Sequence, residues 1–322
     1  RQCRARALCA MEWKKKKEDW AANNKEQDKK LHSFYSGIVP EIDYRSVLQK
    51  EGSATRVASS AVLSVLAKKI ENMVVASADL SNSDKTDGFL KNTHSFTRGD
   101  FTGAFLQAGV SELTMAAVMN GIALHGGVIA ACGTFFVFSD YMKPAVRLAC
   151  LMGLPVKYIW THDAFRVGED GPTHQPVEQE AQLRLMEHLK NHHGENSMVV
   201  LRPADSAETT VAWKMAIENR KTPTALILSR QNIKDLPSEA NNRYTDALQS
   251  EKGAYIVQDC NGIPDIILIA SGSEVATLVE GAQLLKKDNL NIRIISAPSE
   301  GLFRKQPESY RNSVIPDNVP VF

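Results

Sequence analysis

One segment of the chain combines histidines, carboxylates, glycines and prolines directly after a predicted strand. The strand is expected at 156–161, and the fifteen positions 162–176 hold two His, three carboxylates, two Gly and two Pro. Glycine and proline fix a backbone, while imidazole and carboxylate groups can bind a polar ligand. The segment is therefore a candidate site, and a polar surface loop that caps the following helix is the open alternative. Its titratable residues include His162, Asp163, Glu169, Asp170 and His174.

A metal site is the less favoured interpretation of this segment. His162 and His174 lack the short i, i+4 spacing of ligands on one helix, and no cysteine accompanies them. The five cysteines of the chain are scattered and form no CxxC pair, so neither a disulfide framework nor a zinc site is indicated. We expect no metal ligands in this chain, and a reducing, cytoplasmic location.

Aromatic residues three positions apart follow a second predicted strand, at 127–132. Phe135, Phe138 and Tyr141 would fall on one side of a helical turn. Such a set can stack on a planar heterocycle, or it can fill the core. From the residues alone, core packing is the simpler interpretation.

A carboxylate opens an otherwise apolar helix predicted at 111–124. Ser111 could cap this helix, and Glu112 could interact with its dipole. The functional alternative is a buried carboxyl group with a raised pKa.

The composition excludes several classes of protein. The chain has 322 residues, of which 43% are hydrophobic and 23% charged, as in a globular protein of about two domains. The formal net charge is +1, so nothing in the overall charge favours binding to nucleic acid or a membrane. The longest apolar runs fall short of the roughly 20 residues of a membrane-spanning helix.

Predicted helices and strands alternate from residue 53 onward. Such a βα pattern predicts a doubly wound, mostly parallel α/β sheet covered by helices on both faces. The strands are expected at 73–77, 127–132, 156–161, 198–201 and 224–229, and the helices at 53–70, 111–124, 139–152, 178–191 and 206–219. In such sheets, ligands bind beyond the carboxyl ends of the strands, where the candidate residues lie.

The two ends of the chain differ from this middle part. Residues 1–30 hold ten Lys and Arg against five Asp and Glu, and 1–52 is interpreted as a solvated helical linker from an upstream domain. A polar stretch at 231–252 separates the domain at 53–240 from a second, truncated α/β unit at 253–322. This unit has strands at 266–270 and 292–296 and a helix at 274–286. The chain is therefore expected to be the interior of a longer protein.

The candidate loops, in this order, resemble transketolase. Residues 161–176 read THDAFRVGEDGPTHQP, which is similar to the family signature over nearly its whole length. The resemblance covers the chain from about residue 54 and implies the pyrimidine-binding domain followed by the beginning of the C-terminal domain. Further similar blocks are 77–80 (SADL), 120–127 (NGIALHGG), 133–141, 201–205 (LRPAD), 229–232 (SRQN) and 270–275 (ASGSEV).

The resemblance implies a transferase that uses thiamine diphosphate to move a two-carbon ketol unit between sugar phosphates in the pentose phosphate pathway. Glu112 would act on N1′ of the aminopyrimidine and His174 on the substrate, both as catalytic residues. The family's other cofactor-binding positions correspond to Asp79, Phe135, Phe138 and Tyr141. The substrate-binding positions correspond to Arg56, Ser83, His162, Asp170, His174 and Arg230.

The family's GDG…N motif, which holds Mg²⁺ (or Ca²⁺) and the cofactor's diphosphate, is not found in this sequence. The resemblance therefore implies that a separate or missing N-terminal domain binds the metal, and that the fragment is inactive alone. It also implies a homodimer, or a complex with a separate N-terminal chain. The chain departs from many relatives at Ser111 and Leu113. The alternatives are a noncatalytic assembly or binding module and an enzyme like 1-deoxyxylulose-5-phosphate synthase, although the DGPTHQP string favours transketolase.

Overall fold

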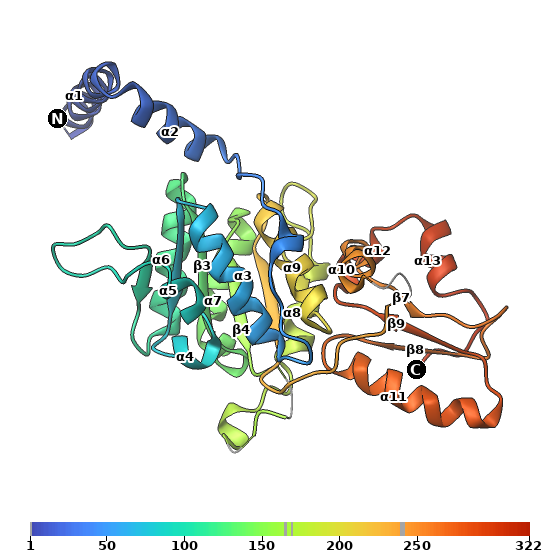
Figure 1. Cartoon of the computed structure of the whole chain (residues 1–322). Coiled ribbons are helices and arrows are strands. Elements are labelled where there is room, and N and C mark those ends of the chain that lie inside the picture. Colours follow the sequence, from blue (N-terminus) through green and yellow to red (C-terminus); the bar gives the residue numbers. More distant parts are fainter. Residues whose placement is uncertain (1, 164–165, 169, 239–241) are drawn as a thin grey trace.

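The computed structural model describes residues 2–163, 166–168, 170–238 and 242–322. It contains two sheets in chain order, preceded by two helices that project from the rest of the molecule (Figure 1). The N-terminal part comprises α1 (Gln2–Asn23), α2 (Lys25–Ser36), η1 (Tyr44–Ser46), α3 (Thr55–Lys69), β1 (Met73–Ser77), α4 (Ser81–Asp84), α5 (Asp87–Leu90), β2 (Phe105–Gln107), α6 (Glu112–His125) and β3 (Ile129–Phe135). The middle comprises η2 (Phe136–Phe138), α7 (Ser139–Met152), β4 (Lys157–Thr161), η3 (Pro172–His174), α8 (Gln179–His188), β5 (Val199–Leu201), α9 (Ser206–Glu218) and β6 (Thr224–Leu228). The remainder comprises α10 (Arg243–Ala247), η4 (Leu248–Lys252), β7 (Tyr255–Gln258), β8 (Ile266–Ala270), α11 (Glu274–Leu285), η5 (Lys286–Asp288), β9 (Ile292–Ser296), α12 (Glu300–Arg304) and α13 (Glu308–Val314).

The first sheet has the strand order β2-β1-β3-β4-β6-β5, and every pairing is parallel. Alternate residues of a strand point to opposite faces, so each strand contributes to two cores. On β3, Ala130 and Cys132 pack with residues of α6 and α7. Ile129 and Ala131 pack with residues of α3 and α9 on the other face. The expected doubly wound α/β sheet is thereby confirmed.

The second sheet has the order β7-β9-β8, with β7 antiparallel and β8 parallel to β9. Residues of α11 pack on one face of this sheet, and residues of α12 and α13 pack on the other. The expected strands at 266–270 and 292–296 coincide with β8 and β9. The antiparallel β7 was not expected, because its four residues follow a polar stretch and carry a weak signal.

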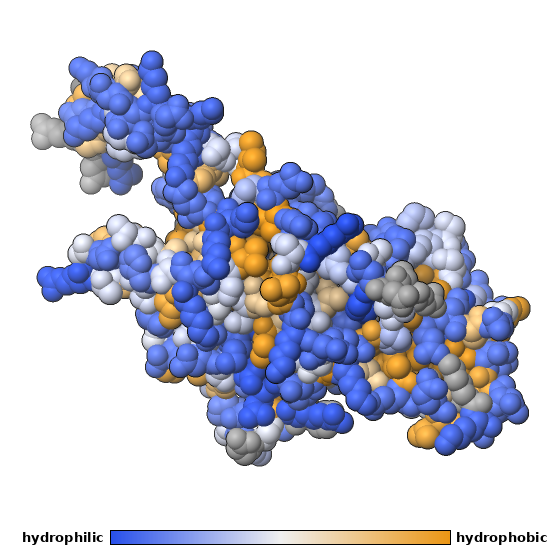
Figure 2. Space-filling model, viewed as in Figure 1, coloured by the Kyte–Doolittle hydropathy of each residue, from blue (hydrophilic) through white to orange (hydrophobic). Residues whose placement is uncertain are grey.

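The N-terminal helices lie apart from both sheets. Figure 2 shows a predominantly hydrophilic surface over α1 and α2 in this view. Trp13 is exposed on α1, whereas Tyr35 near the end of α2 stacks at a tilt against His125 of α6, with 6.0 Å between the ring centroids. No helix in the described ranges is long and apolar enough to cross a membrane.

Candidate functional site

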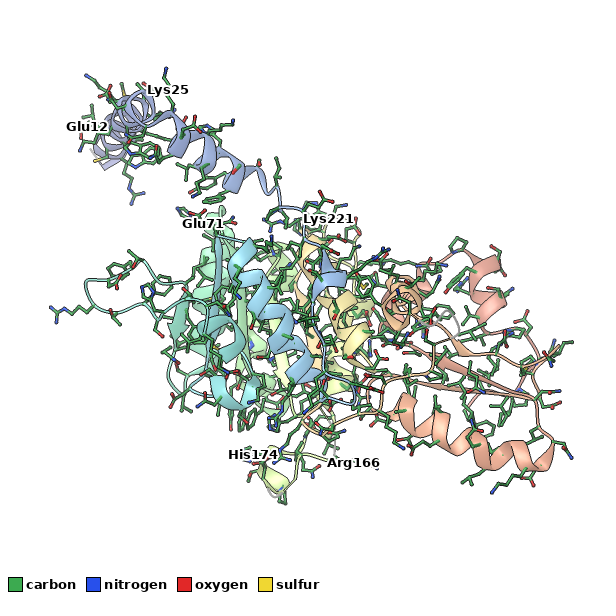
Figure 3. All side chains as sticks on the ribbon, viewed as in Figure 1. Glu12, Lys25, Glu71, Arg166, His174 and Lys221 are labelled. Carbon is green, nitrogen blue, oxygen red and sulfur yellow. The ribbon has the colours of Figure 1, made fainter. Side chains whose placement is uncertain are left out.

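The candidate residues gather at the carboxyl edge of four neighbouring strands. β1, β3, β4 and β6 are adjacent in the sheet, so the loops that follow them meet at one edge. His174 and Arg166 lie below this edge in Figure 3, in the loop after β4. Parts of that loop, including Glu169, are outside the described residues.

His162 occupies the centre of the site, directly after β4. Its backbone is left-handed, with a φ of 63°, which is uncommon for a residue other than glycine. The buried ring packs against Phe135 with 3.7 Å between centroids. Its Nδ1 lies 2.9 Å from Thr161 Oγ1 and its Nε2 lies 3.4 Å from Arg56 Nη1.

The environment of His162 disfavours a positive charge on the ring. Burial is the main cause, and the neighbouring Arg56 and Arg230 add to it, so that the pKa of His162 falls to about 3. The imidazole is therefore neutral near neutral pH and can donate one hydrogen bond and accept another.

Two arginines flank this histidine. Arg56, in the first turn of α3, donates from Nη1 to the Ser83 carbonyl oxygen at 2.7 Å and to Ser83 Oγ at 3.3 Å. Arg230, just after β6, lies 3.8 Å from the Asp170 carboxylate. Burial, and then repulsion from Arg230, lower the pKa of Arg56. Two guanidinium groups close together have the charge and the hydrogen-bond donors to bind an anion.

The aromatic residues form a stacked series that leads from the core to the surface. Phe135 and Phe138 stack with a centroid distance of 6.0 Å, and Phe138 and Tyr141 do so at the same distance. Phe135 is buried, whereas Tyr141 is 62% exposed. The core role falls to Phe136, which is fully buried. Core packing is therefore the wrong interpretation for Tyr141, whereas Phe138 is half-buried between the core and the surface.

His174 joins this aromatic series from the loop after β4. Its ring meets Phe138 edge-on, with centroids 5.2 Å apart, and lies 6.0 Å from Phe135. Its Nδ1 is 2.9 Å from Thr173 Oγ1. The structure thus brings both histidines of the loop against Phe135. Among the described residues, His174 Nε2 makes no hydrogen bond.

Glu112 is the first residue of α6 and is buried. Within the described residues its side chain has one long contact, in which Thr134 Oγ1 donates to Oε1 at 3.5 Å. Thr134 immediately precedes Phe135, so the carboxylate lies beside the beginning of the aromatic series. Ser111 does not cap the helix, because its hydroxyl donates to the Ala108 carbonyl oxygen at 2.7 Å.

Asp79 follows β1 at the same edge, with a left-handed φ of 65°, and is exposed. Within the described part of the chain, its side chain makes no hydrogen bond or ion pair. A neighbouring carboxylate that sequence reasoning missed, Asp84, is buried and accepts hydrogen bonds from Ser77 Oγ, Thr86 N and Thr86 Oγ1 at 2.7–2.8 Å. It fixes the loop that carries Ser83.

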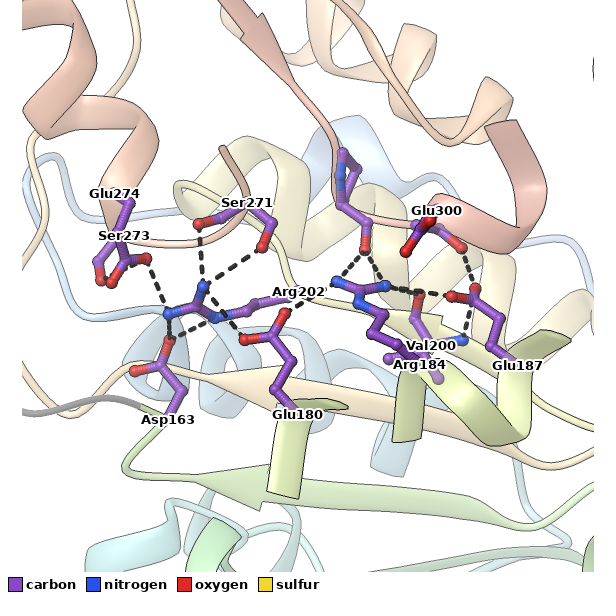
Figure 4. Close-up of polar contacts among 12 residues, drawn as sticks. Asp163, Glu180, Arg184, Glu187, Val200, Arg202, Ser271, Ser273, Glu274 and Glu300 are labelled. Carbon is purple, nitrogen blue, oxygen red and sulfur yellow. Dashed lines mark hydrogen bonds and ion pairs between the residues drawn. The ribbon is translucent and has the colours of Figure 1, made fainter. Parts of the chain in front are cut away.

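A second cluster that sequence reasoning missed begins at Asp163, the residue that follows His162. Asp163 and Arg202 are both buried, and Arg202 Nε donates to Asp163 Oδ2 at 3.0 Å (Figure 4). The available signal was a charged residue directly after a candidate histidine, and an arginine directly after a predicted strand. Nothing in the sequence shows that these two residues meet.

The described residues contain no group of three or more His, Cys, Asp or Glu side chains that could hold a metal ion. Apart from Asp79, the described carboxylates of the site contact arginines, hydroxyl groups or backbone amides.

Comparisons with known proteins agree with this arrangement. Residues 51–235 match the family model described as "Transketolase, pyrimidine binding domain", and residues 253–322 match "Transketolase-like TK C-terminal domain". The chain is 44% identical over 316 residues to the transketolase of Bacillus subtilis, which covers 95% of this chain and 45% of that protein. It is 44% identical over 267 residues to the transketolase of Geobacillus stearothermophilus, covering 83% of this chain and 38% of that one. The chain thus spans less than half the length of these curated relatives.

Solved structures show the same relationship. The chain resembles a transketolase from Leishmania mexicana with a TM-score of 0.86 and 36% identity, over 98% of this chain and 45% of that one. It also resembles a structure titled "Split gene transketolase, inactive beta4 tetramer", with a TM-score of 0.59 and 29% identity, over 77% of this chain and 72% of that chain.

Proposed function

The chain belongs to the transketolase family, and from this premise we propose that it provides the half of a thiamine diphosphate site that binds the pyrimidine ring, together with the sugar-phosphate pocket. The proposed reaction is the transfer of a two-carbon ketol unit from a ketose phosphate to an aldose phosphate. The observation that carries this proposal is the meeting of a buried carboxylate, a stacked aromatic series, two histidines and two arginines at one sheet edge.

The residues present fit an aminopyrimidine ring. Thiamine diphosphate, when bound, supplies the nucleophilic carbon for cleavage of the bond beside a carbonyl group. Phe138 and Tyr141 offer ring faces for stacking. Glu112 has one long contact to Thr134, and its role would be to hold a proton at the ring nitrogen N1′.

The remaining residues suit a sugar phosphate. Arg56 and Arg230 would bind the terminal phosphate, because guanidinium groups match its oxygens in geometry and charge. Asp170, Ser83 and the neutral ring of His162 would bind hydroxyl groups. His174 would exchange a proton with a substrate oxygen through Nε2, since Nδ1 faces Thr173.

We assign the same domain limits as the sequence indicated. Residues 1–52 form a helical linker, 53–240 the pyrimidine-binding domain and 253–322 the beginning of a C-terminal domain; residues 239–241 themselves are outside the described part. The diphosphate and its Mg²⁺ or Ca²⁺ would be held by an N-terminal domain, which is either a separate chain or another part of the same protein. We propose a cytoplasmic location, because the buried cysteines Cys132 and Cys150 are free thiols.

Reconstitution tests the proposed activity. The purified chain is mixed with the N-terminal part of the Bacillus subtilis relative that it does not cover, and transfer from xylulose 5-phosphate to ribose 5-phosphate is assayed. We expect turnover that requires thiamine diphosphate, Mg²⁺ and both chains, and none from this chain alone. A mixture that forms a complex by sedimentation but shows no such turnover would contradict the proposal, as would activity of the chain alone.

A further inference from the structure

Arg202 connects the two sheets of the chain and contacts Asp163, the residue that follows His162. It follows β5 of the first sheet and is 6% exposed. Its Nε and Nη2 both lie 3.0 Å from Asp163 Oδ2. Its Nη2 also lies 2.8 Å from Glu274 Oε2, and its Nη1 lies 3.2 Å from the Ser271 carbonyl oxygen. A single guanidinium group therefore joins the loop of the site to the first turn of α11, the helix that packs on the second sheet (Figure 4).

The Asp163 side of this cluster adjoins a strained backbone position. Asp163 follows His162, whose left-handed φ of 63° is unfavourable for a residue with a Cβ atom. Such a conformation persists only when its surroundings determine it. Thr161 and Phe135 hold the His162 ring on one side, and the Asp163–Arg202 pair holds the next residue of the chain on the other side.

Asp163 depends strongly on this arginine. Its side chain is 1% exposed, and Oδ1 has no hydrogen-bond partner in the described structure. Arg202 is the cation that faces it, whereas Glu274 and Glu180 are carboxylates near the same guanidinium group. Removal of Arg202 would leave a buried carboxylate among like charges, and the loop would have to move to hydrate it.

The second sheet holds Arg202 in place. Gly272 N donates to the Arg202 carbonyl oxygen at 3.0 Å, and Arg202 N donates to the Pro298 carbonyl oxygen at the same distance. A Cβ atom on Gly272, where φ is +60°, would lie 2.7 Å from Arg202 Nε. The close approach of the loop 271–273 is therefore built into the sequence, and the position of Arg202 depends on how the second sheet docks.

We propose that Arg202 is a positioning residue: through Asp163 it holds His162 in the left-handed conformation that presents its ring to the substrate, and through Ser271 and Glu274 it makes that conformation depend on the second sheet. The role of His162 toward the substrate rests on the proposed function. The positioning itself is independent of it and can be tested without catalysis.

The test compares Arg202→Met, Arg202→Lys and Glu274→Gln with Arg304→Met, which removes a surface ion pair with Glu300. In the purified chain, NMR follows the ring protons of His162, and the variant His162→Gln identifies their resonances. These resonances report the position of the ring, because it lies 3.7 Å from Phe135 and is shifted by the ring current of that residue. We expect Arg202→Met to move these resonances toward those of a free histidine. Glu274→Gln should produce a smaller shift in the same direction, and Arg202→Lys a partial recovery. Arg304→Met should leave them unchanged.

Folding is checked by circular dichroism, and Glu274→Gln keeps the test decisive if Arg202→Met does not fold. Unchanged His162 resonances in the folded variants would overturn the proposal.

In the reconstituted enzyme, the folded Arg202→Met variant should raise KM for the sugar phosphate roughly 10- to 100-fold with a smaller change in kcat. Shifted resonances with an unchanged KM would support the positioning role of Arg202 and contradict the substrate role of His162. The test therefore distinguishes failure of the positioning proposal from failure of the proposed function.

Discussion

The guanidinium group of Arg56 faces the Nε2 atom of His162 at 3.4 Å, and this contact determines which tautomer the histidine adopts. A guanidinium group offers only donors, so Nε2 must be the unprotonated nitrogen. The proton then resides on Nδ1, which can donate to Thr161 Oγ1 at 2.9 Å. The site therefore contains a neutral His162 beside two charged arginines, Arg56 and Arg230.

We predict that His162 makes the stability of the chain depend on pH. Its pKa of about 3 in the folded state is below the ordinary value of 6.5, so below pH 6.5 the unfolded chain binds a proton that the folded chain excludes. Stability is therefore lost as the pH falls from about 6.5 toward 3. Urea midpoints measured across this range should fall more steeply for the wild type than for His162→Gln.

The neighbouring Asp163 contributes with the opposite sign. Burial is the main cause that raises its pKa from 3.8 to about 6, so between these values the folded chain binds the extra proton. Its contribution to stability is present at low pH and is lost as the pH rises through this window. Because both wild type and His162→Gln retain Asp163, their difference isolates the histidine. Parallel pH profiles would contradict the neutral assignment.

How far the sequence determined the fold depended on the length and regularity of each element. β1, β9 and α7 lie where their apolar patterns place them, at 73–77, 292–296 and 139–152. β2 has three residues, which is too short for a recognisable alternation. Its pairing with β1 follows from the parallel register of the whole sheet, which no local pattern encodes.

The site was predictable where its residues follow strands of the parallel sheet. His162, Arg230 and Phe135 meet because β4, β6 and β3 end at the same edge. The partners that fix them were not predictable. Asp163 and Arg202 are separated by 39 positions, and their pairing depends on how the second sheet docks against the first.

We predict different kinetic effects for Glu112→Ala and Arg230→Ala in the reconstituted enzyme. In the proposed function Glu112 acts on the pyrimidine ring, so its loss should lower kcat roughly 100-fold or more. In the same proposal Arg230 binds the substrate phosphate, so its loss should chiefly raise KM. Initial rates over a range of sugar-phosphate concentrations separate the two effects. Equal changes confined to KM would contradict the role assigned to Glu112.

The buried ion network around Arg243 should contribute strongly to stability. Arg243 Nη2 lies 2.6 Å from Tyr255 Oη and 3.2 Å from Glu208 Oε1, and its Nε lies 2.6 Å from Asp205 Oδ2. Both carboxylate side chains are fully buried. Arg243→Met would leave them without their cation, which should cost about 3–5 kcal/mol in the free energy of unfolding.

Urea denaturation of this variant and of Arg304→Met gives the comparison. The Arg304–Glu300 pair lies on the surface, with side chains 61% and 42% exposed, so its loss should change the free energy of unfolding by less than about 1 kcal/mol. Similar small losses in both variants would show that the buried carboxylates relax into solvent, which would contradict the prediction.

The outer face of α6 should mediate association of the chain. Ala116 and Met119 are buried against the sheet, whereas Val118 and Leu124 are exposed on the opposite side, together with Gly121. Exposed apolar side chains beside a small residue allow close approach of a second helix, which is the basis of this prediction. Val118→Glu places a charge on this face without disturbing the core.

We expect sedimentation velocity to show concentration-dependent association of the wild type. The Val118→Glu variant should weaken this association at least about tenfold, or about 1.4 kcal/mol. Lys14→Glu, a change on α1, should associate as the wild type does. A wild type that stays monomeric at every concentration would refute association through α6, and it would leave the roles of Glu112 and His162 unaffected.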